Sequence, residues 1–167
     1  FAWCYTGGPY PLAYNALGDI FVVLFFGLIA VCITFYVHTL GLNWLILLNA
    51  LACGLFTNNL LVINNIRDFE EDMVSGKRTT IVLFGKSFGR NLIAISCLFA
   101  ASTPIINALA THSFFPLLGI IPACICWMQI KNILSEESKE SLYKLLKNTG
   151  LNVFLYGILV SLGFLLN

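Results

Sequence analysis

Long apolar runs alternate with polar connections along most of this chain. Five runs are predicted to form membrane-crossing helices, at residues 20–37, 44–63, 92–110, 114–128 and 151–166. A helix that crosses a membrane needs about 17–25 apolar residues, and the first three runs supply them directly. The last two are shorter and need flanking residues. The pattern therefore predicts an all-α integral membrane protein with about five transmembrane helices.

The composition excludes an ordinary soluble domain. Hydrophobic residues make up 59% of the chain and charged residues only 10%, against about 45–50% and 25% in soluble domains. So few charges cannot cover the surface of a soluble protein of this size. The net charge of +1 gives no reason to expect a nucleic-acid partner.

The positive charges lie in only two of the connections. All nine Lys and Arg residues fall within residues 64–91 and 129–150, and threading five helices places both connections on one face. Positive charge marks the cytoplasmic side of membrane proteins. We therefore expect a multi-pass protein of the inner (cytoplasmic) membrane with these loops in the cytoplasm.

An amphipathic stretch, residues 135–148, lies in the second of these connections. It is predicted to be a separate short helix capped by Ser135, since serine favours that position. Leu142, Leu145 and Leu146 would then either rest on the membrane surface or belong to a solvated connector.

A polar segment, "NNIRDFEEDMVSGKRTT" (residues 64–80), directly follows the second apolar run. If the helix continues past Ile63, then Asn64, Asp68 and Asp72 lie one turn apart on one side. Carboxylates at this spacing repel each other, so a cation is expected between them. Mg²⁺ suits the position, because it binds oxygen ligands and takes one or two carboxylates together with water and substrate phosphates.

Two cations follow the acidic residues. Gly76 allows the chain to turn back, so that Lys77 and Arg78 face the same phosphate oxygens. A metal and cations beside acidic groups favour diphosphate binding. The alternative is a solvated helix face with charged partners.

Two segments resemble one protein family. Residues 64–80 are similar to the second aspartate-rich motif of the UbiA superfamily of intramembrane prenyltransferases. Residues 5–27, "YTGGPYPLAYNALGDIFVVLFFG", resemble the segment that marks its menaquinone branch. One departure is Thr80, where we expect leucine. Asp19 is expected to cap the first helix. The alternative is that it is a third acidic group near the central cavity of the family fold.

The resemblance implies a ring of nine transmembrane helices with two aspartate-rich motifs that face each other. This chain shows only the second motif. We therefore expect residues 1–167 to be the C-terminal part of a single prenyltransferase domain, without the first helices and the first motif, and inactive alone.

The resemblance also implies roles for individual residues. The expected ligands of Mg²⁺, which bridges the diphosphate, are Asp68 and Asp72 with support from Asn64 and Asn65. Lys77 and Arg78 would neutralise the leaving diphosphate. Arg67 lies away from the side of the helix that carries Asn64, Asp68 and Asp72. It would either reach the diphosphate or pair with Glu71. The residues expected at the aromatic acceptor are Tyr5, Thr6, Gly7 and Gly8.

The implied reaction transfers a polyprenyl group from polyprenyl diphosphate to 1,4-dihydroxy-2-naphthoate, with loss of CO₂ and diphosphate, to give demethylmenaquinone. Other acceptors, namely 4-hydroxybenzoate, homogentisate or haem, are the alternatives within the superfamily. A non-enzymatic ion-binding membrane protein is the alternative outside it, but such a protein should place ionisable groups inside its spans.

Overall fold

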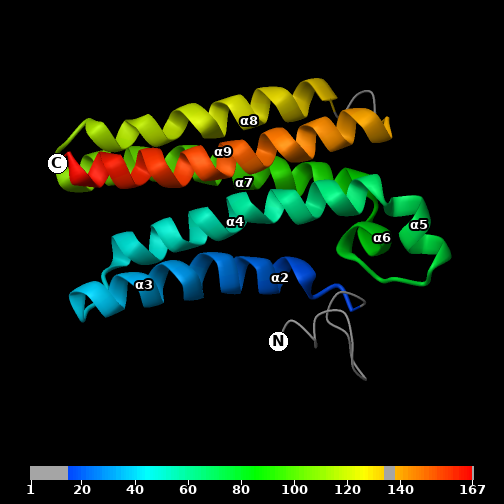
Figure 1. The fold of residues 1–167 in the computed structure, drawn as a ribbon, viewed down its shortest axis with the longest axis horizontal. Helices are drawn as coiled ribbons and strands as arrows, with labels where there is room; N and C mark the ends of the chain where they lie inside the picture. The colour runs from blue at the N-terminus through cyan, green and yellow to red at the C-terminus, as the bar shows by residue number, and fades with distance from the viewer. Residues whose placement is uncertain (1–14, 134–137, 167) are drawn as a thin grey trace.

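The computed structural model describes residues 15–133 and 138–166, and apart from one isolated backbone bridge its regular structure there is helical. Helix α4 (Trp44–Arg67) lies in the middle of the bundle (Figure 1). The first span lies on one side of α4, and α7 (Lys86–Thr111), α8 (Ile120–Ile133) and α9 (Lys139–Leu165) lie on the other. Helices satisfy their own backbone hydrogen bonds, as an apolar environment requires.

The first span is one continuous helical stretch. It consists of α2 (Gly18–Val22), the π-helical segment η2 (Val23–Ile29) and α3 (Ala30–Thr39). Segment η2 approaches α4 closely at two glycines. A Cβ on Gly27 would lie 2.5 Å from the Ala50 carbonyl oxygen, and one on Gly54 would lie 2.7 Å from the carbonyl oxygen of Val23. Small residues of this kind let membrane helices pack backbone to backbone.

Side-chain amides join α4 to α7 within the apolar bundle. Asn49 and Asn107 exchange two hydrogen bonds, Nδ2 to Oδ1 in each direction, at 3.0 and 2.9 Å. Ser96 on α7 donates to Asn59 on α4. A buried polar group without a partner is costly, so these pairs fix the register of the two helices.

Four helical stretches are long and apolar enough to cross a membrane: Gly18–Thr39, Trp44–Arg67, Lys86–Thr111 and Lys139–Leu165. The predicted span at 114–128 is a shorter apolar stretch, Phe115–Lys131. It begins as a 3₁₀ turn, η3 (Phe115–Gly119), with Pro116 near its start, and continues as α8. The all-α, multi-pass membrane fold is confirmed: among the described residues, four helical stretches are long and apolar enough to cross a membrane, and one further apolar stretch is shorter.

The prediction of a separate amphipathic helix at 135–148 is wrong. Helix α9 begins at Lys139 and continues without a break through the last span. Its cap is Ser138, whose Oγ accepts a hydrogen bond from the Ser141 N–H at 3.2 Å. Leu142 and Leu145 are buried in the core rather than on a membrane surface. Their packing against the bundle extends the helix beyond its apolar run.

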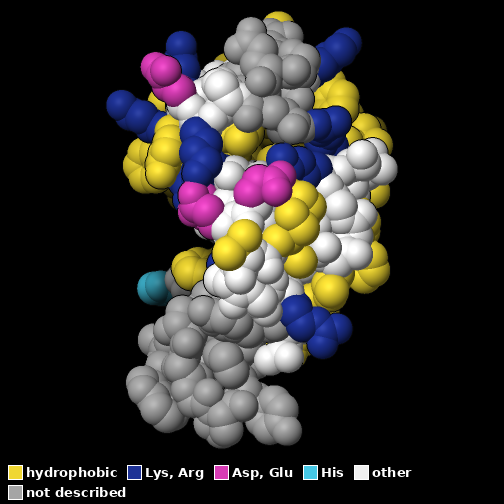
Figure 2. Space-filling view, turned by 90° about the vertical axis from the view of Figure 1, so that its right-hand side faces the viewer, with side chains coloured by type: hydrophobic (Ala, Val, Ile, Leu, Met, Phe, Trp, Pro, Cys, Tyr) yellow, Lys and Arg dark blue, Asp and Glu magenta, His cyan; other side chains and the backbone are white. Residues whose placement is uncertain are grey.

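Charged side chains gather at one end of the bundle. The short helices α5 (Phe69–Val74) and α6 (Thr80–Phe84) lie at this end, beyond α4 (Figure 1). Figure 2 looks onto this end, where Lys and Arg side chains surround Asp and Glu. The long polar connections therefore lie together, as their charge predicted.

The contact between η2 and α4 can be tested with two glycine substitutions. Gly54→Ala should lower the free energy of unfolding by about 1–3 kcal/mol, because the added methyl group overlaps the Val23 backbone. Gly157→Ala is the matched control, because its Cβ would meet nothing within 4 Å, and it should be neutral or stabilising by up to about 1 kcal/mol. Thermal unfolding in detergent measures both, and equal melting temperatures would contradict the close packing.

Candidate functional site

The polar segment begins where α4 ends. Helix α4 continues past Ile63 as predicted, but it ends at Arg67, and Asp68 forms the junction with α5. The hydrogen-bond pattern of a helix persists across this junction. The Asp68 N–H donates to the Asn64 carbonyl at 3.0 Å, and the Asp72 N–H donates to the Asp68 carbonyl at 2.8 Å. Asp68 and Asp72 thus remain one turn apart.

Arg67 pairs with Asp68 through two bonds. Its Nε donates to Asp68 Oδ1 and its Nη2 to Asp68 Oδ2, both at 2.7 Å. The same Nη2 also donates to Asn64 Oδ1 at 2.6 Å. Arg67 does not pair with Glu71, which forms its ion pair with Lys139 instead, and the alternative, a contact with the diphosphate, stays a prediction. The arginine neutralises the first carboxylate of the motif.

The Arg67 hydrogen bonds also decide the charge of Asp68. They lower the pKa of the Asp68 carboxyl below its ordinary value, and partial burial opposes them less strongly. Asp68 is therefore ionised at neutral pH. An ionised carboxylate is the form that binds a divalent cation.

Asp72 lies on α5 and is buried, with 6% of its surface exposed. Lys77 Nζ contacts its Oδ1 at 3.1 Å. The turn that brings Lys77 back is allowed by Gly76, which has a φ of 73°. Within the described residues, Asp72 Oδ2 is buried and has no hydrogen-bond partner. Such an atom is costly to leave unpaired.

Two residues of α9 reach the motif, and sequence analysis assigned neither of them. Arg67 Cζ lies over the ring of Tyr143, 4.4 Å from its centre, and Lys139 forms its ion pair with Glu71. A cation over an aromatic ring is attracted by about 0.5–1 kcal/mol at an exposed site. The one sequence feature that could have indicated these contacts is the spacing of Lys139 and Tyr143, which lie one helical turn apart on the same side of α9.

Asp19 does not cap the first helix. Helix α2 has no side-chain cap, and Leu17 occupies the capping position. The Asp19 carboxylate instead accepts from Asn58 Nδ2 on α4 at 2.9 Å and from Thr80 Oγ1 at the start of α6 at 2.5 Å. The residue therefore joins the first span to the segment that follows Lys77.

The donor groups fit a magnesium ion only in part. The orphaned Asp72 oxygen and the ionised Asp68 carboxylate are the hard ligands that Mg²⁺ prefers. Asn65 is buried on α4, and the amide of Asn64 lies 3.3 Å from Asp68 Oδ2. Within residues 15–133 and 138–166, no group of three or more His, Cys, Asp or Glu side chains could hold a metal ion. The described ligands are thus two carboxylates supported by amides.

The remaining expected site residues are Arg78 and the four residues expected at the aromatic acceptor, and the structure describes only Arg78. Arg78 is exposed on the turn beside Lys77, and its backbone forms a parallel bridge with Asn15. The residues expected at the aromatic acceptor lie outside the described residues: Tyr5, Thr6, Gly7 and Gly8.

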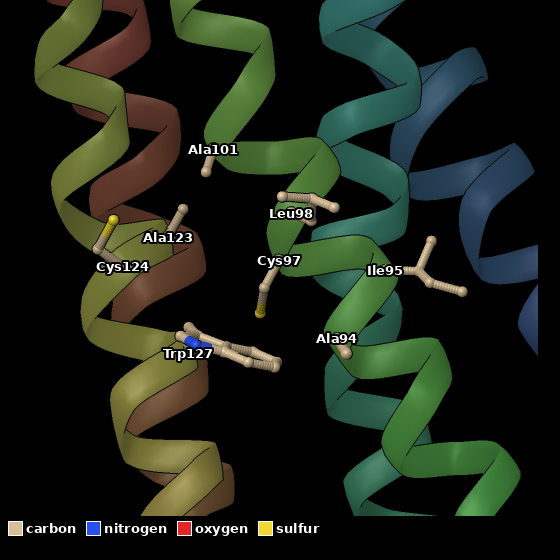
Figure 3. A pocket seen from close by; sticks show the side chains of 8 residues that line it. All are labelled: Ala94, Ile95, Cys97, Leu98, Ala101, Ala123, Cys124 and Trp127. Carbon is tan, nitrogen blue, oxygen red and sulfur yellow. The ribbon is translucent and has the colours of Figure 1, made fainter.

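A cavity of about 430 Å³ lies between α7 and α8 and is lined mainly by apolar side chains. Cys97 and Trp127 point toward each other across it, and the other labelled side chains are mainly aliphatic (Figure 3). No charged side chain lines it. The polar end of α4 is therefore the candidate site.

Comparisons with known proteins point in one direction. The sequence profile of the UbiA prenyltransferase family matches residues 1–158. The chain is 32% identical to the 1,4-dihydroxy-2-naphthoate octaprenyltransferase of Escherichia coli over 166 residues. This aligned segment covers 98% of this chain and 53% of the relative. The protein of the same name from Haemophilus influenzae is 34% identical over 163 residues, or 97% of this chain and 53% of the relative.

A third relative carries a different name. The 2-carboxy-1,4-naphthoquinone phytyltransferase of Synechocystis is 27% identical over 94 residues, or 56% of this chain and 31% of the relative. No solved structure matches the chain significantly. The chain spans about half the length of the first two relatives.

The Arg67–Asp68 pair should make stability depend on pH. Arg67→Met should lower the free energy of unfolding at pH 7 by about 0.5–1 kcal/mol, because the partly exposed Asp68 loses its partner. The native pKa of Asp68 is lowered from 3.8, so the pair stabilises fully above the unfolded value and loses its effect as pH falls through the native value.

Melting temperatures in detergent should therefore differ at pH 7, and the difference should narrow as the pH falls through the native pKa of Asp68, which lies below 3.8. Lys144→Met, which removes an exposed cation on α9, serves as the control and should change little at either pH. A difference for Arg67→Met that persists unchanged in acid would contradict the ion pair.

Proposed function

The chain belongs to the UbiA prenyltransferase family, as its two motifs predicted, and we propose that it forms part of the active site of a magnesium-dependent aromatic prenyltransferase. The proposed reaction transfers a polyprenyl group from polyprenyl diphosphate to 1,4-dihydroxy-2-naphthoate, with release of CO₂ and diphosphate. The observation that carries the proposal is the buried Asp72 carboxylate, which has one oxygen on Lys77 and the other without a partner.

Asp68 and Asp72 are the proposed metal ligands, with Asn64 and Asn65 in support. Bound Mg²⁺ would supply positive charge that makes diphosphate a better leaving group. The two carboxylates are already neutralised by Arg67 and Lys77, so a metal–diphosphate complex enters a region without a large charge of either sign. Metal ligands missing from the described residues would then have to come from elsewhere in the functional enzyme.

Lys77 and Arg78 are the proposed diphosphate-binding residues. Lys77 Nζ lies on Asp72, so it can contact a phosphate oxygen beside the metal without a large movement. Arg67 can join them only by leaving Asp68, because its Nε and Nη2 are occupied there. Cations of this kind stabilise the charge that develops on a departing diphosphate.

The acceptor assignment is supported by the names of the relatives. The relatives named above are called naphthoate or naphthoquinone transferases, and the matches to the first two cover nearly all of this chain. Tyr5, Thr6, Gly7 and Gly8 are the proposed acceptor-binding residues. The electron-rich ring would attack the allylic carbon as the diphosphate leaves, and the carboxylate of the ring would leave as CO₂.

The proposed active-site loops lie on the cytoplasmic side of the inner membrane. Both connections that carry Lys and Arg, together with α5 and α6, lie at one end of the bundle. This distribution is typical of the cytoplasmic side. A polyprenyl diphosphate has its charged head at this depth and its hydrocarbon chain in the bilayer, which suits a site at the end of membrane helices.

The choice of acceptor can be tested directly. Membranes that contain the natural full-length protein should prenylate 1,4-dihydroxy-2-naphthoate and release one CO₂ for each product. Parallel assays with 4-hydroxybenzoate, homogentisate and haem should show little or no product. Prenylation of 4-hydroxybenzoate alone would overturn the naphthoate assignment and leave the prenyltransferase proposal standing.

The metal ligands can be tested by removing one charge at a time. Asp68→Asn and Asp72→Asn in the full-length protein should reduce prenyl transfer by at least about a hundredfold without loss of expression. Glu70→Gln is the matched control, because Glu70 is exposed on the same short helix and pairs only distantly, at 3.7 Å, with Lys86. Binding of Mn²⁺, measured by electron paramagnetic resonance, should weaken in the two aspartate variants alone. Normal turnover in either variant would exclude that carboxylate as a ligand.

A further inference from the structure

The carboxylate of Asp19 joins three elements that are far apart in the sequence. Asn58 on α4 donates to its Oδ1 at 2.9 Å, and Thr80 on α6 donates to its Oδ2 at 2.5 Å. Asp19 itself lies near the start of the first span. The two hydrogen bonds connect α2, α4 and α6.

The segment that Asp19 reaches carries the two cations of the candidate site. Residues 75–78, the cationic turn, connect α5 to the residue that caps α6. The start of the turn is fixed by Asp72, whose carbonyl accepts from the Lys77 N–H at 3.0 Å and from Ser75 Oγ at 3.1 Å. Ser75, Gly76 and Arg78 are exposed, so packing contributes little to holding the turn.

The end of the turn is fixed by contacts to the first span. Thr79 caps α6 by accepting from the Val82 N–H at 3.2 Å, and Thr80 then donates to Asp19. The backbone bridge between Asn15 and Arg78 connects the same two segments. The chain between Asp72 and Thr80 is therefore held at both ends, by α5 at one and by the first span at the other.

We infer that Asp19 is a positioning residue for the proposed diphosphate site: through Thr80 it fixes the cationic turn, so that Lys77 and Arg78 stay beside Asp72. The inference rests on the proposed function for what the cations bind, but the tether itself does not. In this inference Asp19 acts through Thr80 and not on the diphosphate itself.

A carboxylate suits this position better than an amide. Asn58 is 3% exposed, and both Asn58 Nδ2 and Thr80 Oγ1 are donors that need an acceptor. A carboxylate offers two acceptor oxygens. An asparagine at position 19 offers one acceptor oxygen and one amide donor, so it can keep only one of the two hydrogen bonds in its present direction.

The test compares three variants of the full-length protein: Asp19→Asn, Thr80→Val and Thr80→Ser. Thr80→Val keeps the shape of the side chain and removes the hydroxyl, whereas Thr80→Ser keeps the hydroxyl. The matched control is Thr111→Val, which removes a hydroxyl that donates to the Asn107 carbonyl at 2.9 Å at the other end of α7. Each protein is measured for the KM of both substrates, the affinity for magnesium pyrophosphate, and hydrogen–deuterium exchange of residues 75–80.

We expect Asp19→Asn and Thr80→Val to raise the KM for polyprenyl diphosphate and to weaken pyrophosphate binding, each about tenfold. The KM for the acceptor should stay within about twofold. Exchange in residues 75–80 should become faster in the same two variants and stay unchanged in Thr80→Ser and Thr111→Val. Asp19→Asn and Thr80→Val combined in one protein should weaken pyrophosphate binding no more than the single variants do, because both substitutions remove the same contact.

Three results would overturn the inference. Thr80→Val without effect beside an impaired Asp19→Asn would mean that Asp19 acts on a substrate directly. A raised KM for the acceptor instead of the donor would place Asp19 in the acceptor site. Faster exchange with unchanged pyrophosphate affinity would mean that the position of the turn does not matter.

The proposed function fails in a different way. A wild-type protein that transfers no prenyl group to any acceptor would refute it, while exchange and pyrophosphate binding would still test the tether. A wild-type protein that transfers normally, with an unaffected Thr80→Val variant, would refute only the inference about Asp19.

Discussion

The ion pair between Arg67 and Asp68 organises the polar end of this bundle. Its two hydrogen bonds of 2.7 Å neutralise a carboxylate at the end of a membrane helix, where an unpaired charge would be costly. The guanidinium also reaches Asn64 and lies over the ring of Tyr143. One side chain therefore connects the end of α4, the junction to α5 and the first turns of α9.

The same need for polar partners fixes the rest of the bundle. Asn49 pairs with Asn107 between α4 and α7, and Asn152 donates to Gln129 between α9 and α8 at 3.0 Å. Between apolar helices in an apolar solvent, such bonds select one register among many that would bury similar hydrocarbon surface. The first span joins α4 differently, by the close approach of Gly27 and Gly54 and by the Asp19 carboxylate. The central helix thus carries both the packing and the candidate site.

The geometry of the polar end explains why a membrane protein concentrates its charges there. Each motif carboxylate has a cation of its own, yet Asp72 Oδ2 finds no partner in the described part of the chain. The balance of charge permits burial, and the unpaired oxygen keeps a position for a ligand. The proposed diphosphate site uses both properties: neutral overall charge for stability, and unsatisfied bonding capacity for binding.

Local pattern alone determined much of this protein. The apolar runs predicted the helices, because a membrane-crossing segment must satisfy its own backbone, and the spacing of Asn64, Asp68 and Asp72 placed them together because helical periodicity is local. The turn at Gly76 that returns Lys77 to Asp72 was also visible in the sequence. The family was evident from two short motifs, since each combines several residue types in a fixed order.

Tertiary structure decided which partner each polar group takes. Arg67 was expected at the diphosphate or at Glu71, but Lys139 from α9 takes Glu71, and Tyr143 covers Arg67 as it binds Asp68. Asp19 was expected to be a helix cap, but its carboxylate accepts hydrogen bonds from Asn58 and Thr80 instead. Residues 139–148 continue into the last span as one helix, because Leu142 and Leu145 pack into the buried core of the bundle. Such partners come from segments tens of residues away, and only the packing of helices brings them within hydrogen-bond distance.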